Sequence, residues 1–186
     1  MKICIISSSL AEHSHSRLLA DFVNQKAQAQ NMEVTFWDLR TRPIRTLVPE
    51  FHHETYRNKD PIILNFLDDI AQSDIVILTT PVYHGSYSGS LKMALDQLSK
   101  DALKGKLVGF VCHGHNLLKS ALPSSHLRTI VASMHGYSLH TEVCTSRADF
   151  THNGDLVVSA SPEVHSRIET LFDELKQFSH LKMPPV

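Results

Sequence analysis

The chain has 186 residues, of which 42% are hydrophobic and 20% charged, and its formal net charge at pH 7 is −1. These values are typical of one globular domain with a substantial core, so we expect a single domain over residues 1–186. A near-neutral charge argues against a nucleic-acid partner, and no segment approaches the ~20 apolar residues of a membrane span. Three cysteines without a Cys-x-x-Cys pair favour neither a disulfide framework nor a zinc site. We therefore expect a cytoplasmic protein that is not anchored to a membrane.

The hydrophobic pattern changes period repeatedly along the chain. Short apolar runs that suit fully buried strands alternate with stretches in which apolar residues recur at helical spacing. The predicted elements, in chain order, are strand 3–6, a helix from about Ser16, strand 33–37, helix 61–72, strand 75–79, helix 91–99, strand 107–112, helix 117–134, strand 137–144 and a helix from Pro162. Helix 61–72 has clear start signals, because Asp60 can cap it and Pro61 suits its first position.

This alternation predicts an α/β fold, a doubly wound five-stranded parallel sheet with helices on both faces, because parallel neighbours need crossover connections. In such sheets ligands bind beyond the carboxyl ends of the strands. Three loops at these ends have unusual composition, namely 7–16, 81–88 and 113–116. The long irregular region 38–60 is either a functional loop or the cover of a site.

The first loop contains five serines and leads into a helix, where backbone amides and the helix dipole favour an anion. It has neither the G-x-G-x-x-G fingerprint nor a Walker lysine, so a mononucleotide phosphate fits better than a dinucleotide. The alternative is that the serines only cap the helix. His13-x-His15 and His113-x-His115 lack acidic or cysteine partners at metal-site spacing, and we expect no metal site.

The second loop carries the most specific motif. Pro81-Val82-Tyr83-His84-Gly85-Ser86-Tyr87-Ser88-Gly89, followed by Leu91-Lys92 and Leu95-Asp96, resembles the P-x-Y-x-G-S-x-x-G-x-L-K-x-x-L-D signature of the NAD(P)H-dependent FMN reductase family, which is flavodoxin-like in fold. The serine-rich first loop, the stretch CHGHN and the stretch SRADFTHNGDL are similar to further regions of that family. Pro and Gly keep the second loop out of regular structure, which leaves its amides available to a flavin edge.

The resemblance implies one flavodoxin-like FMN-binding domain that transfers hydride from NADPH or NADH to bound FMN and onward to a small-molecule acceptor: free flavin, a quinone, an azo compound or a metal oxyanion. The cofactor carries the chemistry, so no catalytic side chain is expected. The cofactor-binding residues implied are Ser8, Ser9, Ser14, Ser16 and Arg17 at the phosphate, Pro81, Val82, Tyr83, His84 and Gly85 at the ring, and His113, Gly114 and His115 on its other side.

The family also implies a homodimer or homotetramer, with helix 91–99 at the interface and residues 40–57 reaching a neighbouring site. Many members carry an Arg early in the phosphate loop, where this chain has Leu10-Ala11-Glu12. Two alternatives remain, a flavodoxin-like electron carrier and a non-catalytic flavin-binding protein. Such carriers are generally strongly acidic, which this chain is not. Cys4, Cys112 and Cys144 fall on predicted strands and are expected to be buried and inert.

Overall fold

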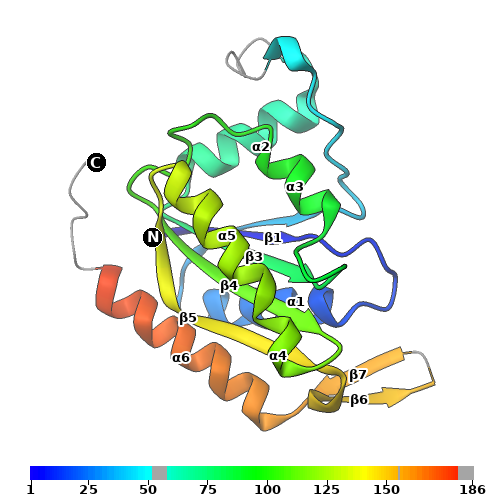
Figure 1. The fold of residues 1–186 in the computed structure, drawn as a ribbon. Coiled ribbons are helices and arrows are strands. Elements are labelled where there is room, and N and C mark those ends of the chain that lie inside the picture. Colours follow the sequence, from blue (N-terminus) through cyan, green and yellow to red (C-terminus); the bar gives the residue numbers. More distant parts are fainter. Residues whose placement is uncertain (52–57, 155, 180–186) are drawn as a thin grey trace.

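The computed structural model describes residues 1–51, 58–154 and 156–179 (Figure 1). Five parallel strands form one sheet in the order β2-β1-β3-β4-β5. They are β1 (Lys2–Ser7), β2 (Glu33–Asp38), β3 (Ile75–Pro81), β4 (Leu107–Gly114) and β5 (Tyr137–Ser146). The doubly wound sheet predicted from the alternation of elements is confirmed.

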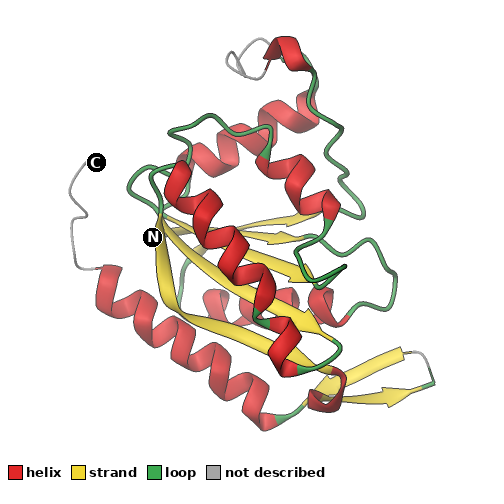
Figure 2. Cartoon of the chain, in the orientation of Figure 1, coloured by secondary structure: helices red, strands yellow, loops and turns green. Residues whose placement is uncertain are grey.

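Helices cover both faces of this sheet (Figure 2). On one face α1 (His15–Ala29) and α6 (Pro162–Ser179) pack against alternate strand residues such as Ile3 and Ile5. On the other, α2 (Pro61–Gln72), α3 (Gly89–Leu95) and α5 (Leu122–Ser133) pack against Cys4 and Ile6. Because successive strand residues point to opposite faces, the short apolar runs supply both cores at once.

The predicted helix starts at Pro61 and Pro162 are confirmed. The Asp60 side chain accepts a hydrogen bond from the Ile62 amide at 2.9 Å, which satisfies one of the free donors of the first turn of α2. The apolar stripe of α6 is buried as expected at Val164, Ile168, Leu171, Phe172 and Leu175, while Phe178 is half-buried.

Two predicted helices differ from the structure. The helix expected over 91–99 runs from Gly89 to Leu95, because Ser88 caps it early and its last turn tightens, with Leu98 N donating to Leu95 O. The helix expected over 117–134 is two helices, α4 (Leu117–Ser120) and α5, separated at Ala121. Pro123 explains the break, since it has no amide to donate and begins a new helix.

One supersecondary element was not predicted at all. After the 3₁₀ turn η3 (Arg147–Asp149), strands β6 (Phe150–Asn153) and β7 (Leu156–Ala160) form an antiparallel hairpin beyond the end of β5 (Figure 1). The region 38–60 contains the short 3₁₀ helix η1 (Pro49–Phe51), and its residues 52–57 lie outside the described part. No helix of the described residues is long and apolar enough to cross a membrane.

The core face of α6 gives a direct test of the packing. Phe172 is fully buried and Phe178, on the same helix, is only partly buried. Phe172→Ala should lower the free energy of unfolding by about 3–5 kcal/mol, since it leaves a cavity in a closed core. Urea denaturation should show a clearly smaller loss for Phe178→Ala. Equal losses for the two variants would contradict this description of the core.

Candidate functional site

The three unusual loops meet at the carboxyl edge of the sheet, where they follow β1, β3 and β4. From β1 the chain turns to β2 on one side, while β3 lies on the other side, so the strand order reverses between β1 and β3. Such a reversal point opens a crevice beyond the strand ends and is the usual ligand position in this type of sheet. The first and second loops flank it.

A buried hydroxyl network joins these two loops. Ser8 Oγ donates to Thr79 O at 2.8 Å, and Ser88 Oγ donates to Ser8 Oγ, also at 2.8 Å. Ser90 Oγ donates to Ser8 O at 2.6 Å. Ser8 is completely buried. Its hydroxyl proton is donated within the protein, and the residue links the two loops.

The start of α1 has the polar groups that a phosphate needs. Ser14 caps the helix by accepting from the Arg17 amide at 3.3 Å, and Ser9 Oγ accepts from the Ala11 amide at 3.4 Å. The hydroxyls of Ser7 and Ser16 are buried without a hydrogen-bond partner among the described residues. An unpaired buried hydroxyl costs about 1–3 kcal/mol, and a phosphate oxygen at this helix start would relieve that cost for Ser16.

The arginines next to the first loop are already paired. Arg17 Nη1 contacts Asp38, its Nε lies 3.1 Å from Asp21 Oδ1, and its guanidinium stacks over Phe36 at 4.8 Å. Arg40 pairs with Glu12 at 3.6 Å. Thus the positive charge of Arg17, a residue assigned to the phosphate by resemblance, is compensated by two carboxylates.

The second loop is more regular than the sequence suggested. Tyr83 and Ser86 exchange two backbone hydrogen bonds, of 2.9 and 3.0 Å, around His84 and Gly85. Both central residues have positive φ, 51° and 78°, which defines a tight two-residue turn of type I′. Of the four amides of this turn, those of Tyr83 and Ser86 donate across it, whereas those of His84 and Gly85 donate no hydrogen bond to any described residue. These amides can therefore donate to a ligand edge.

The three predicted residues of the third loop, His113, Gly114 and His115, do not face a common site. Gly114 is packed closely, since a Cβ there would lie 3.0 Å from Ser120 N and 3.1 Å from Val82 Cγ2. His115 is exposed, whereas His113 points toward α1 and its carbonyl accepts from Val82 N at 2.8 Å. Gly114 thus allows α4 and the second loop to approach β4.

A histidine cluster connects α1, β4 and the β6–β7 hairpin. The rings of His15 and His113 stack, with centroids 4.1 Å apart and planes 3° from parallel. His15 Nε2 lies 2.8 Å from His152 Nε2, and Phe150 packs edge-on against both stacked rings. Sequence reasoning missed this cluster, because His152 lies on the hairpin that was not predicted. Within the described ranges, no three or more His, Cys, Asp or Glu side chains are arranged so that they could hold a metal ion.

Burial controls the charge of this cluster. Burial, followed by the charges of His152 and Arg147, lowers the pKa of His15 to about 4. Burial and the neighbouring His15 lower the pKa of His113 to about 3, against a smaller opposing effect of Asp149. Both rings are therefore neutral at pH 7.

Cys4 and Cys112 are buried, as expected for strand residues, whereas Cys144 is only partly buried. Burial raises the pKa of Cys4 to about 12, and burial together with Glu142 raises that of Cys144 to about 11. Cys112 is fully buried, and its pKa is also raised by burial. None of the three is a thiolate at neutral pH.

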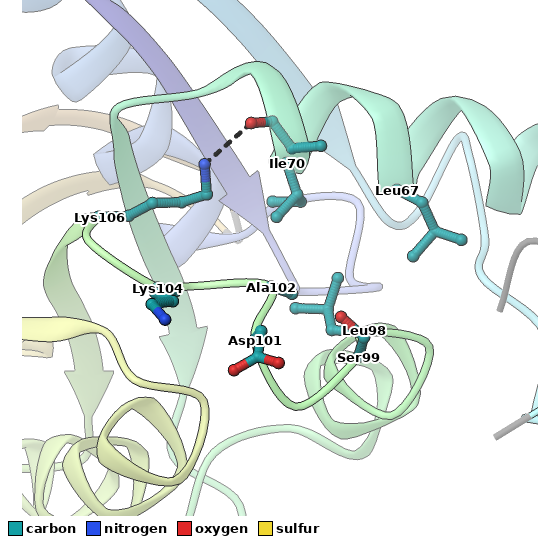
Figure 3. A pocket seen from close by; sticks show the side chains of 9 residues that line it. Leu67, Ile70, Leu98, Ser99, Asp101, Ala102, Lys104 and Lys106 are labelled. Carbon is teal, nitrogen blue, oxygen red and sulfur yellow. Dashed lines mark hydrogen bonds between the residues drawn. The ribbon is translucent and has the colours of Figure 1, made fainter. Parts of the chain in front are cut away.

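A cavity of about 390 Å³ lies at the opposite, amino-terminal edge of the sheet, between α2 and the segment that leads into β4 (Figure 3). Lys106 reaches toward the end of α2, where its amino group donates to Ala71 O at 3.0 Å. The residues that line the cavity are Leu67, Ile70, Ala71, Leu98, Ser99, Asp101, Ala102, Lys104 and Lys106. No predicted site residue is among them.

A helix start with an unpaired buried hydroxyl, beside a turn with two free amides at a reversal of strand order, suits a flavin mononucleotide. These features define an FMN-binding protein of flavodoxin-like fold. Residues 1–150 match the family model for NADPH-dependent FMN reductases, and the chain belongs to this family. It is an FMN-dependent NAD(P)H oxidoreductase.

Known proteins are similar to this chain in sequence and in fold. An FMN-dependent NADPH-azoreductase of Staphylococcus aureus (strain USA300) is 37% identical over 158 residues, 83% of this chain and 82% of the relative. Among solved structures, the apo form of an NADH:FMN oxidoreductase (EMOB) superposes with a TM-score of 0.77 at 21% identity, covering 98% of this chain and 96% of that one. The NAD(P)H:acceptor oxidoreductase FerB of Paracoccus denitrificans gives 0.72 at 17% identity, covering 95% and 97%.

The turn at Gly85 gives the test of this site. Gly85→Val places a β-branched residue at a φ of 78°, at a strain of about 1–2 kcal/mol, and should weaken FMN binding roughly 5- to 30-fold. Lys92→Ala is the control, because Lys92 is exposed and its amino group pairs with Asp96, the residue that follows α3. Flavin fluorescence titration of both variants measures the difference. A Gly85→Val protein that binds FMN as tightly as Lys92→Ala would argue against the turn as the flavin contact.

Proposed function

We propose that this oxidoreductase passes its electrons to flat aromatic acceptors, such as azo compounds or quinones. The observation that carries the proposal is an apolar rim beside the Tyr83–Ser86 turn. Tyr83 is 50% exposed, Leu118 85% and Leu122 43%. The rim is continuous with the turn, since a Cβ at Gly85 would lie 3.8 Å from Leu122 Cδ1. Apolar side chains this exposed suit a ligand that covers them in use.

We assign the cofactor contacts to the two flanking loops. Ser9, Ser14 and Ser16, with the amides at the start of α1, hold the phosphate, while Ser8 fixes the loop from behind. Pro81, Val82 and Tyr83 support the turn whose amides, at His84 and Gly85, orient the ring edge. His113 and Gly114 close the site from β4. Arg17 supports the first loop through its ion pairs with Asp38 and Asp21.

The protein's part in the reaction is binding and orientation. FMN, when bound, supplies the hydride and electron-transfer chemistry. The two turn amides fix the edge of the ring, and the rigid hydroxyl network holds their distance from the phosphate end. The apolar rim excludes water from the face where donor and acceptor bind. NADPH and NADH both fit this scheme as donors.

Several wider features belong to the proposal as well. We propose a cytoplasmic, single-domain protein that forms a homodimer or homotetramer. The apolar residues of α3 (Leu91, Ala94 and Leu95) are buried within their own subunit, so contacts between subunits would use its exposed side. Light scattering at micromolar concentration measures the oligomeric state, and a monomer would contradict this part of the proposal.

Leu118 provides the test of acceptor class. Leu118→Asp should lower kcat/KM for an azo dye or a quinone roughly 5-fold, because it removes about 1 kcal/mol of apolar contact, and should leave FMN affinity unchanged. Val158→Asp, on the exposed face of β7, is the matched control. The assay follows anaerobic oxidation of NADPH and NADH by the FMN-loaded protein with each acceptor. Turnover with a metal oxyanion but with neither aromatic acceptor would overturn the proposal.

A nearly neutral chain is unlike a carrier that docks basic redox partners. The same assay therefore separates an enzyme from a flavodoxin-like carrier or a non-catalytic flavin-binding protein. The enzyme oxidises pyridine nucleotide with multiple turnovers once FMN is supplied. Bound FMN without any such oxidation would favour the alternatives.

A further inference from the structure

The His15–His152 pair can take up one proton without losing its hydrogen bond. With the two Nε2 atoms 2.8 Å apart, one ring donates its N–H and the other accepts. Within the described part of the chain, the Nδ1 atoms of both rings make no hydrogen bond. The accepting ring already carries its proton on Nδ1, whereas the donating ring has an unprotonated Nδ1. If the donating ring takes up a proton at that Nδ1, the N–H···N hydrogen bond remains and the pair gains one positive charge.

The groups around this pair come from four elements. His13 and Glu12 lie on the loop before α1, His113 stacks on His15 from β4, Phe150 packs against it from β6, and Arg147 acts on it from η3. Asp149 acts on His113, and its Oδ1 accepts a hydrogen bond from Arg167 Nη1 at 2.9 Å. In this setting His15 is neutral at pH 7, because burial and the nearby charges of His152 and Arg147 lower its pKa.

Few unpaired positive charges are available at the first loop to compensate the charge of a phosphate. Arg17 is paired with two carboxylates and Arg40 with one. The helix start contributes the equivalent of only about half a charge. His15 is the first residue of α1, between Ser14 and Ser16, so its pair with His152 adjoins the helix start and can gain a charge.

We propose that binding of the FMN phosphate at the first loop is coupled to uptake of one proton by the His15–His152 pair, which becomes the counter-charge of the phosphate. The inference rests on the proposed placement of FMN. It gives the unpredicted hairpin a function, because His152 on β6 completes the pair.

The coupling makes FMN affinity depend on pH. The free protein holds His15 neutral, and a bound dianion raises the affinity of the pair for a proton. FMN binding therefore takes up a proton at any pH between the pKa of the pair in the free protein and its higher pKa in the FMN-bound protein. FMN affinity falls as the pH rises from the lower value to the upper one. With one proton taken up in full, the limiting slope is about tenfold per pH unit. A phosphate monoester has its second pKa near 6, so above about pH 7 the proton is bound by the protein.

Calorimetry measures the proton directly. FMN is titrated into the flavin-free protein at pH 7.5 in two buffers of different ionisation enthalpy, and the difference in heat gives the number of protons taken up. We expect a substantial fraction of one proton for the wild-type protein, and none for riboflavin, which lacks the phosphate. Fluorescence titration from pH 6.5 to 8.5 should show FMN affinity falling with pH while riboflavin affinity stays flat.

Variants assign the proton to the pair. The double variant H15N/H152N should bind FMN with no proton uptake and a flat pH profile, whereas His13→Asn, on the same loop, should behave as wild type. FMN binding without proton uptake by the wild-type protein would overturn this inference and leave the proposed function intact. Uptake that is equal for riboflavin, or lost in His13→Asn, would also overturn it. A protein that binds no FMN at any pH would instead contradict the placement of the cofactor.

Discussion

The candidate site depends on the hydroxyl network at Ser8. This residue follows β1 directly, and its hydroxyl donates to β3 through Thr79 O while it accepts from Ser88 at the head of α3. The network therefore ties the loop that begins α1 to the loop that contains the Tyr83–Ser86 turn. A mononucleotide has a phosphate at one end and a ring at the other, and these loops must hold both at a fixed separation. Buried hydrogen bonds with both partners satisfied provide such rigidity.

A second connection holds the other side of the first loop. The stacked rings of His15 and His113, with Phe150 against them, join α1, β4 and the hairpin. This contact differs in kind from the serine network, because its rings are titratable and burial is the largest cause that lowers the pKa of His15 and His113. The first loop thus has one support that does not respond to pH and one that can. In the proposed coupling a bound anion acts on the second support, whereas the first keeps the loop in place.

The sequence was sufficient for the sheet, because its buried strands and amphipathic helices have patterns that are local to each element. It was sufficient for the family as well, since the motif at 81–96 is continuous in the chain. Features that depend on contacts distant in sequence could not be predicted. The resemblance places Arg17 at the phosphate, but its ion pair with Asp38, at the end of β2, is a contact that the sequence does not reveal. The β6–β7 hairpin is short and largely exposed, so it has no hydrophobic pattern that identifies it.

The central claim is that FMN lies across the carboxyl edge, with its phosphate at the start of α1 and its ring at the Tyr83–Ser86 turn. A crystal structure of the FMN-loaded protein tests it most directly. We expect phosphate oxygens within hydrogen-bond distance of Ser16 Oγ, and ring-edge acceptors within hydrogen-bond distance of the His84 or Gly85 amide. FMN bound in the cavity at the amino-terminal edge, or with its phosphate away from α1, would contradict it.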